Sequence, residues 1–183
     1  WGIDNTTQVV AYDAGNGAYA SRLWWLVRWL GSERVAVLDG GFKAWTEAAL
    51  PVTTALPVVT ASRFAPQLQH EMLLEAASVG QRAADPSWRV LDARAPERYA
   101  GAVEPLDTKA GHVPGAHNHP FAGNLGPEGR FLPAAQLKAR LQQSLGAVPA
   151  DRAAMMCGSG VTACHNLLAL EIAGLQGARL YAG

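Results

Sequence analysis

The sequence predicts an α/β fold with mainly parallel sheets flanked by helices, arranged as two domains of the same kind. Short apolar runs alternate with longer helical segments along the chain, which is typical of β-α-β units. The same succession of strand, glycine-rich turn, helix and strand also occurs near both ends of the chain. Two copies of one α/β domain are the simplest explanation of this repeat.

The first copy is expected at the start of the chain. Residues 9–12 form an apolar run that predicts a strand, and a glycine-rich turn follows at 15–17. An apolar helix is expected over 20–30, with Gly31 as its stop signal. Residues 35–38 are continuously apolar, which indicates a buried parallel strand.

The chain changes character after this unit. Prolines at 51, 57 and 66 interrupt a stretch of Thr, Ala and Val that has no helical period. We therefore interpret residues 51–68 as an interdomain linker. A helix over 71–84 and a strand over 89–92 are expected to follow.

The second copy of the unit closes the sequence. An apolar strand is expected over 153–156, followed by a glycine-rich turn at 157–160. A helix over 163–173 then leads to a last strand over 178–181.

Aligning the two copies places Asp13 opposite Cys157. The repeat predicts that residues 1–50 are the C-terminal part of one domain and residues 69–183 a second domain. The first copy lacks its opening half and the second stops just short of its end, so we expect the chain to be a fragment.

Composition narrows the classes of partner. Lys and Arg together number 15 and balance 15 Asp and Glu, so no overall charge attracts nucleic acid or anionic lipid. No apolar stretch reaches the roughly 20 residues of a membrane-spanning helix. The 2 cysteines are too few for a disulfide scaffold, which predicts a reducing compartment, the cytoplasm.

Cys157 is the leading candidate for a catalytic nucleophile. It lies where a strand feeds a glycine-rich turn and then a helix, and ligands gather at the carboxyl ends of parallel strands. Loop amides and a helix N-terminus favour an anionic sulfur there. Gly158 and Gly160 allow a tight turn, while Ser159 and Thr162 add hydroxyl donors. The alternative is a buried structural cysteine.

Spacing argues against two other chemistries at this loop. A cysteine phosphatase needs an arginine at a fixed position after its cysteine, and Ala163 stands there. Cys164 and His165 do not complete a metal site with Cys157, so no metal is expected.

The first turn offers a dinucleotide-binding alternative. Gly15, Gly17 and Ala20 after a strand, with Asp39 ending the next strand, imitate the dinucleotide fingerprint. Two residues intervene between the strand and the glycines, and we favour a plain turn in a degenerate repeat.

Two arginines form the second candidate feature. Arg94 and Arg98 follow the strand that ends at Asp92, and two guanidiniums so close together can hold a carboxylate. The alternative is that they pair with Asp92, Glu97 or loop carbonyls.

These motifs together resemble a known family. They are Asp39-Gly40-Gly41-Phe42 with Trp45, the run from Asp92 to Gly101, residues 111–116 with Asn118, and the Cys157 loop. In this order they resemble the tandem-domain rhodanese family over nearly the whole chain. The resemblance implies two rhodanese-like domains, of which only the second is catalytic.

The neutral loop 157–162 resembles that of the family members that use 3-mercaptopyruvate, whereas members that use thiosulfate carry basic residues there. The resemblance implies that Cys157 takes sulfur from 3-mercaptopyruvate as a persulfide, releases pyruvate and needs no cofactor. Arg94 and Arg98 would hold the donor carboxylate, and Ser159 would relay a proton. The other loop residues would line the donor site: Gly158, Gly160, Val161 and Thr162.

The acceptor implied by the resemblance is a thiol, such as thioredoxin or glutathione, or cyanide. The resemblance also implies an Asp and a His contributed by a part of the first domain that precedes Trp1. The alternatives are a thiosulfate sulfurtransferase and a non-catalytic binding module with the same fold.

Overall fold

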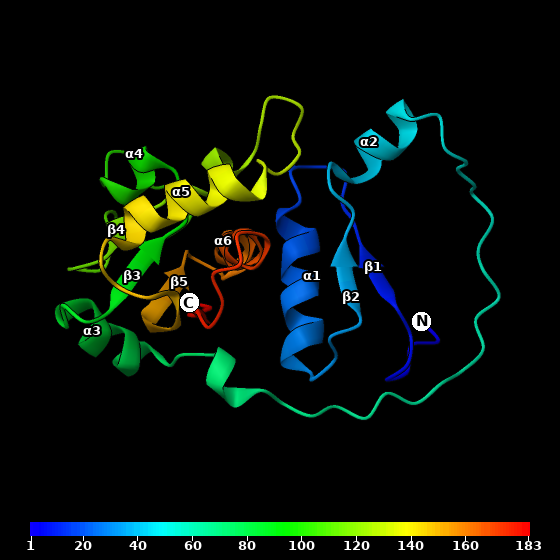
Figure 1. Cartoon of the computed structure of the whole chain (residues 1–183), viewed down its shortest axis with the longest axis horizontal. Coiled ribbons are helices and arrows are strands. Elements are labelled where there is room, and N and C mark those ends of the chain that lie inside the picture. Colours follow the sequence, from blue (N-terminus) through cyan, green and yellow to red (C-terminus); the bar gives the residue numbers. More distant parts are fainter.

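The computed structural model describes residues 1–183, and its first unit is a small parallel sheet with one crossover helix. Strands β1 (Val9–Ala11) and β2 (Val35–Val37) pair in parallel, with Val9 opposite Val35. Helix α1 (Ala18–Trp29) connects them, and helix α2 (Gly41–Glu47) follows β2 (Figure 1).

The second unit contains a larger sheet in which every pairing is parallel. Its strands are β3 (Arg89–Asp92), β4 (His117–Asn118), β5 (Ala153–Met156) and β6 (Arg179–Leu180). They lie in the order β4-β3-β5-β6. The predicted α/β fold with parallel sheets is confirmed.

Helices surround this sheet and connect its strands. The α-helices are α3 (Ala76–Ala84), α4 (Pro96–Tyr99), α5 (Ala134–Leu145) and α6 (Val161–Ile172). Short 3-10 helices span His70–Met72, Phe121–Asn124 and Ala150–Arg152. None of the helices in the chain is both long and apolar enough to cross a membrane.

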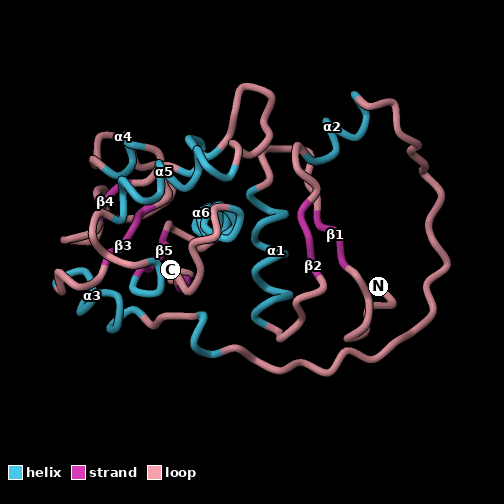
Figure 2. Tube along the Cα trace, in the orientation of Figure 1, coloured by secondary structure: helices cyan, strands magenta, loops and turns pink.

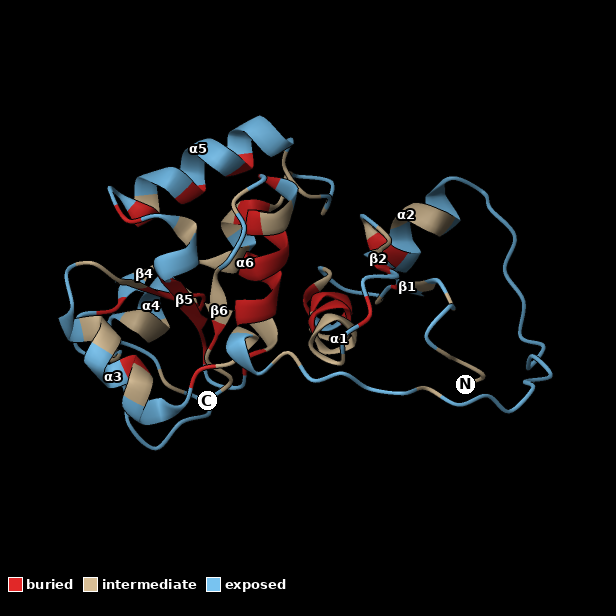
Figure 3. Cartoon of the chain, turned by 60° about the horizontal axis from the view of Figure 1, so that its bottom comes forward, coloured by how far each residue is buried: buried red, intermediate tan, exposed pale blue.

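The two crossover helices, α1 and α6, pack against each other between the two sheets (Figure 1). Helix α6 is buried from Ala163 to Leu170, as Figure 3 shows by its colour. A helix that is buried on so many sides needs such a position, because each side must find a neighbour within the fold. Helix α3 contributes Val79 to a second cluster with Val90 and Met156 of the larger sheet.

The segment before α3 differs from the expected helix over 71–84. Residues 70–72 form a 3-10 turn, and α3 begins only at Ala76. Between them the chain is extended, because Leu73 bridges Leu180 in parallel and the Leu74 N–H donates to the Leu180 carbonyl at 2.8 Å. Pairing with the edge of β6 overrides helix propensity here.

Residues 51–69 contain no helix or strand and run around the outside of the first unit (Figure 2). Helix α5 is an element that the sequence patterns did not predict. It buries Leu137, Leu141 and Leu145 on one side, at the spacing of an amphipathic helix.

The register of β3 and β5 brings two loops together. Asp92 pairs with Met156, and the Ala93 N–H donates to the Met156 carbonyl at 2.8 Å. Both strands therefore end at the same edge of the sheet. Arg94 and Cys157 each follow one of these ends.

Candidate active site

Cys157 directly follows β5, and the residue is only 6% exposed. Gly160 ends the turn in the left-handed region, with a φ of 74°, and is the N-cap residue directly before α6. A Cβ at Gly160 would lie 3.0 Å from the Ala182 Cα and 2.9 Å from the Arg22 Nη1. Glycine is therefore required by both the backbone angle and the surrounding atoms.

The turn surrounds the Cys157 sulfur with hydrogen-bond donors. The Ser159 N–H points at the Sγ at 3.5 Å. Burial alone would raise the pKa of the thiol. The Thr162 hydroxyl and the N–H groups of Ser159, Ala163 and Thr162 outweigh burial, so the pKa of Cys157 is lower than that of an ordinary thiol. The site therefore favours the thiolate, the nucleophilic form of cysteine.

The first unit contains a matching cradle with a carboxylate inside it. Asp13 occupies the position opposite Cys157, and its Oδ1 accepts from the N–H groups of Gly15 at 2.9 Å and Gly17 at 3.0 Å. Its Oδ2 accepts from Tyr19 and Ala20, each at 3.1 Å. This strand-turn-helix geometry therefore holds an anion.

The same bonds bear on the dinucleotide-binding alternative. The amides of Gly15 and Gly17 already bind the Asp13 carboxylate, so they do not face a phosphate. The plain turn that the sequence favoured is what the structure contains.

Arg94 is buried and almost fully paired within the protein. Its Nε lies 3.1 Å from both carboxylate oxygens of Asp92, and its Nη2 donates to Asp92 at 2.7 Å. The same Nη2 donates to the Gly111 carbonyl at 2.6 Å, and the Nη1 reaches Glu104 at 3.3 Å. Hydrogen bonds from Arg94 to Asp92 raise the pKa of Arg94, so its charge is permanent.

Arg98 lies nearer the solvent, with 19% of its side chain exposed. Its Nη2 donates to Glu104 at 2.7 Å and to Asp107 at 3.0 Å, while its Nε is buried without a partner. The pKa of Glu104 falls to about 2, chiefly through the Asp107 N–H and the Arg98 side chain. Glu104 therefore stays charged and anchors the loop that carries Asp107.

Asp107 connects the arginines to the cysteine loop. A Cβ at Gly158 would lie 3.3 Å from its Oδ2, so the Asp107 carboxylate stands directly beside the turn that holds Cys157. The predicted residues Arg94 and Arg98 thus reach the predicted loop 157–162 through the Asp107 carboxylate. Nothing in the sequence pointed to Asp107, because it lies in a loop without periodicity.

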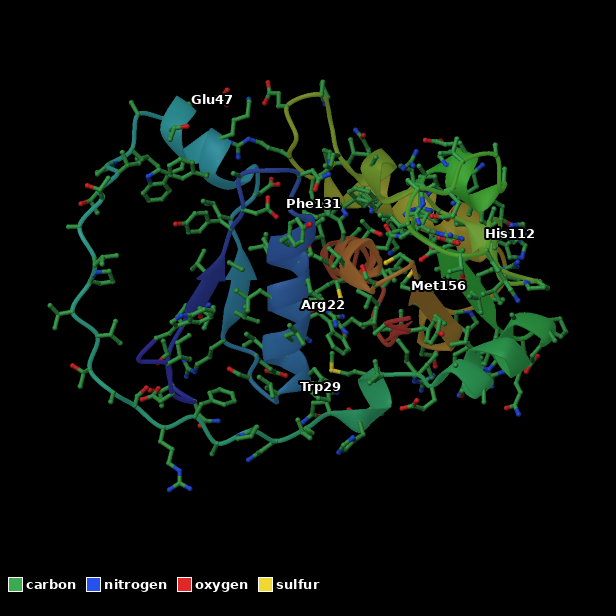
Figure 4. All side chains as sticks on the ribbon, turned by 180° about the vertical axis from the view of Figure 1, so that it is seen from behind. Arg22, Trp29, Glu47, His112, Phe131 and Met156 are labelled. Carbon is green, nitrogen blue, oxygen red and sulfur yellow. The ribbon has the colours of Figure 1, made fainter.

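Arg22 is a second residue that sequence reasoning did not assign. It extends from α1 toward α6, where its Nη1 lies 3.7 Å from the Cys164 sulfur (Figure 4). Its only sequence signal is a charge that interrupts an apolar helix. Burial raises the pKa of Cys164 to about 12, so this second cysteine remains a thiol.

Comparison with known proteins identifies the family. Residues 2–48 and 75–183 match the rhodanese-like domain. The chain belongs to the rhodanese-like family. The expected resemblance is therefore confirmed, and the unmatched residues 49–74 include the interpreted linker.

Two relatives of this rhodanese-like chain have different sulfurtransferase names. It is 47% identical over its whole length to a Pseudomonas aeruginosa protein named "Probable 3-mercaptopyruvate sulfurtransferase", of which it covers 65%. It is 30% identical to the thiosulfate sulfurtransferase of Gallus gallus, of which it covers 63%. The chain thus spans less than two thirds of the length of these relatives.

A solved structure shows the same fold. The crystal structure of SseA from Escherichia coli, a 3-mercaptopyruvate sulfurtransferase, matches this rhodanese-like chain with a TM-score of 0.85 at 30% identity. The match covers 100% of this chain and 68% of SseA.

Proposed function

We propose that the chain is the sulfur-transferring part of a 3-mercaptopyruvate sulfurtransferase, with Cys157 as the sulfur carrier. The observation that carries the proposal is the sulfur of Cys157 inside a cradle of N–H and hydroxyl donors that lowers its pKa. The similarity to the Pseudomonas protein and to SseA supports the choice of donor.

In the first half-reaction the Cys157 thiolate attacks the sulfur of 3-mercaptopyruvate. A new S–S bond forms and the carbon–sulfur bond breaks, leaving its electron pair on carbon as the enolate of pyruvate. The enolate takes up a proton to give pyruvate, and Cys157 carries a persulfide. No external oxidant is needed, because the carbon is reduced as the sulfur is oxidised.

In the second half-reaction an acceptor thiolate attacks the outer sulfur of the persulfide. The S–S bond breaks and the Cys157 thiolate leaves, stabilised by the same cradle. Thioredoxin, glutathione and cyanide are all acceptors of suitable chemistry, and cyanide would give thiocyanate. The two free cysteines fit a reducing compartment such as the cytoplasm.

We assign different tasks to the two arginines. Arg98 would bind the donor carboxylate, because its Nε is buried without a partner and its Nη2 bonds an exposed carboxylate. The family resemblance gives Arg94 the same role. Its nitrogens are bonded to Asp92, Glu104 and Gly111, which favours a positioning role that holds the loop in place.

The loop residues complete the proposed donor site. Ser159 is exposed beside the sulfur and would relay a proton in the step that activates the donor or the nucleophile. The Thr162 hydroxyl, in the first turn of α6, would lower the pKa of the thiol and favour the thiolate. Gly158, Gly160 and Val161 would frame the entrance to the sulfur.

We also propose that the chain divides into two domains. Residues 1–50 and 69–183 would belong to two rhodanese-like domains joined by 51–68. Two β-α-β units with equivalent cradles at Asp13 and Cys157 support this tandem arrangement.

Steady-state turnover of the full-length protein with 3-mercaptopyruvate and with thiosulfate tests the proposal. We expect a clear preference for 3-mercaptopyruvate that disappears in Cys157→Ser. A preference for thiosulfate would mean that the protein is a thiosulfate sulfurtransferase, as its Gallus gallus relative is named. The absence of turnover with either donor would favour a non-catalytic binding module.

A further inference from the structure

The Asp107 carboxylate lies between the arginines and the cysteine loop. Its Oδ2 is 3.0 Å from the Arg98 Nη2 and 3.6 Å from the Arg94 Nη1. The same oxygen stands 3.3 Å from where a Cβ of Gly158 would be. A carboxylate of the protein therefore occupies the place where a donor carboxylate would meet Arg98 beside Cys157.

The charges around this point do not favour an incoming anion. The two guanidiniums face three carboxylates, those of Asp92, Glu104 and Asp107. The cluster thus carries one net negative charge. An anionic donor can pair with one of these guanidiniums only if a carboxylate of the protein first moves away from it.

Asp107 is the carboxylate that can leave at least cost. The side chains of Asp92 and Glu104 are 0% and 5% exposed, whereas that of Asp107 is 42% exposed. Asp92 also accepts from the Arg94 backbone, and Glu104 accepts from the N–H groups of Leu106 and Asp107. Breaking an exposed ion pair costs little, because water replaces its bonds.

We propose that Asp107 determines donor specificity by occupying the carboxylate position on Arg98 until a donor displaces it. This inference rests on the proposed function. A donor with one negative charge exchanges one carboxylate for another and leaves the charge of the cluster unchanged. A dianion such as thiosulfate adds a further negative charge beside the displaced Asp107, so Asp107 selects against it.

Kinetics of Asp107→Asn in the full-length protein form the first test. The KM for 3-mercaptopyruvate should fall about 5-fold with little change in kcat, because the competing carboxylate is gone. The kcat/KM for thiosulfate should rise by a larger factor. Asp107→Glu, which keeps the charge, should resemble the wild type. Glu128→Gln removes a carboxylate that contacts neither arginine. It should leave the kinetic constants for both donors unchanged.

Alkylation of Cys157 gives a second readout that does not depend on turnover. Iodoacetate carries a carboxylate, whereas iodoacetamide has the same shape without the charge. In Asp107→Asn the ratio of their rates at Cys157 should rise about 5-fold in favour of iodoacetate. Mass spectrometry separates this reaction from any at Cys164, which is buried and should stay unmodified.

The outcomes distinguish the two proposals. Wild-type turnover with an unchanged KM and an unchanged alkylation ratio in Asp107→Asn would overturn the role of Asp107 and leave the function intact. If the wild type turned over no donor, the proposed function would fail. The alkylation ratio alone would then decide whether Asp107 controls access of anions to Cys157.

Discussion

At the scale of single residues, the reactivity of Cys157 depends on a few donors. Thr162 supplies the only side-chain hydroxyl among those that lower the pKa of the thiol. Thr162→Val should raise the pKa of Cys157 by about one unit, since a hydrogen bond to an anion contributes about 1.5 kcal/mol. The pH dependence of iodoacetamide alkylation at Cys157 measures this shift.

Thr162→Ser is the matched control for that experiment, because it keeps the hydroxyl and loses only the methyl group. Its alkylation profile should stay close to that of the wild type. Equal pKa values in the Val and Ser variants would show that the hydroxyl does not stabilise the thiolate.

The two cysteines should respond differently to substitution. Cys164 is fully buried and uncharged, so Cys164→Ala should keep sulfur transfer and lower the unfolding free energy by about 1 kcal/mol. Cys157→Ser should abolish transfer with little effect on stability. Urea denaturation and donor turnover measure the two effects, and loss of activity in Cys164→Ala would require a role for the second thiol.

At the scale of elements, the turn between β5 and α6 has no room for a side chain at Gly160. Gly160→Ala should cost about 1–3 kcal/mol, because the left-handed φ is strained and the Cβ would press on Ala182. The turn must shift, so sulfur transfer should fall as well. Thermal denaturation and turnover report the two losses.

Gly80 offers the matched control for this substitution. It lies inside α3, and outside the backbone of its own helix and its chain neighbours no atom stands within 4 Å of the place that a Cβ would take. Gly80→Ala should therefore stabilise the protein by about 0.5–1 kcal/mol. If both substitutions had the same small effect, the turn would not be sterically constrained.

The elements also show what sequence patterns can and cannot predict. The strand at 153–156 follows from a continuous apolar run, and the helix α6 follows from a largely apolar segment. Both signals are local in the sequence. The helix predicted over 71–84 is wrong at Leu73, because the pairing of this extended segment with Leu180 involves a residue far along the chain. Long-range pairing leaves no local signal.

The same distinction holds for the candidate site. The Cys157 loop and Arg98 stand in motifs that can be recognised from sequence, and their roles stay predictions. Asp107 reaches Arg98 only because Glu104 fixes the loop through two backbone N–H groups. The spacing of residues in the sequence does not predict this conformation of the loop.

At the scale of the whole molecule, a buried polar network in the second unit lies beside an exposed hydrogen bond to the first unit. The Asn124 amide donates to Asn166 at 2.7 Å and approaches the His165 ring at 3.4 Å. His165 also stacks on Phe131, whose N–H donates to Asp39 after β2 at 2.8 Å. Burial lowers the pKa of His165 to about 4, so the folded protein holds it neutral.

This network predicts how stability depends on pH. The unfolded chain protonates His165 near pH 6.5, whereas the folded chain resists protonation down to about pH 4. The unfolded state therefore binds more protons between these values, and stability falls as the pH is lowered. The contribution of His165 should reach about 2 kcal/mol at pH 5.

Urea denaturation of the wild type and of His165→Asn at pH 7 and pH 5 isolates this contribution. The variant should lose less stability than the wild type between the two pH values, because it has no group to protonate there. Identical losses would mean that another group causes the pH dependence.

Peptide mass spectrometry after 3-mercaptopyruvate is added without any acceptor shows whether Cys157 carries the transferred sulfur. We predict that the peptide containing Cys157 gains one sulfur atom, that pyruvate is released in equal amount, and that a thiol removes the added sulfur. An unmodified Cys157, or sulfur found only on Cys164, would show that Cys157 is not the sulfur carrier.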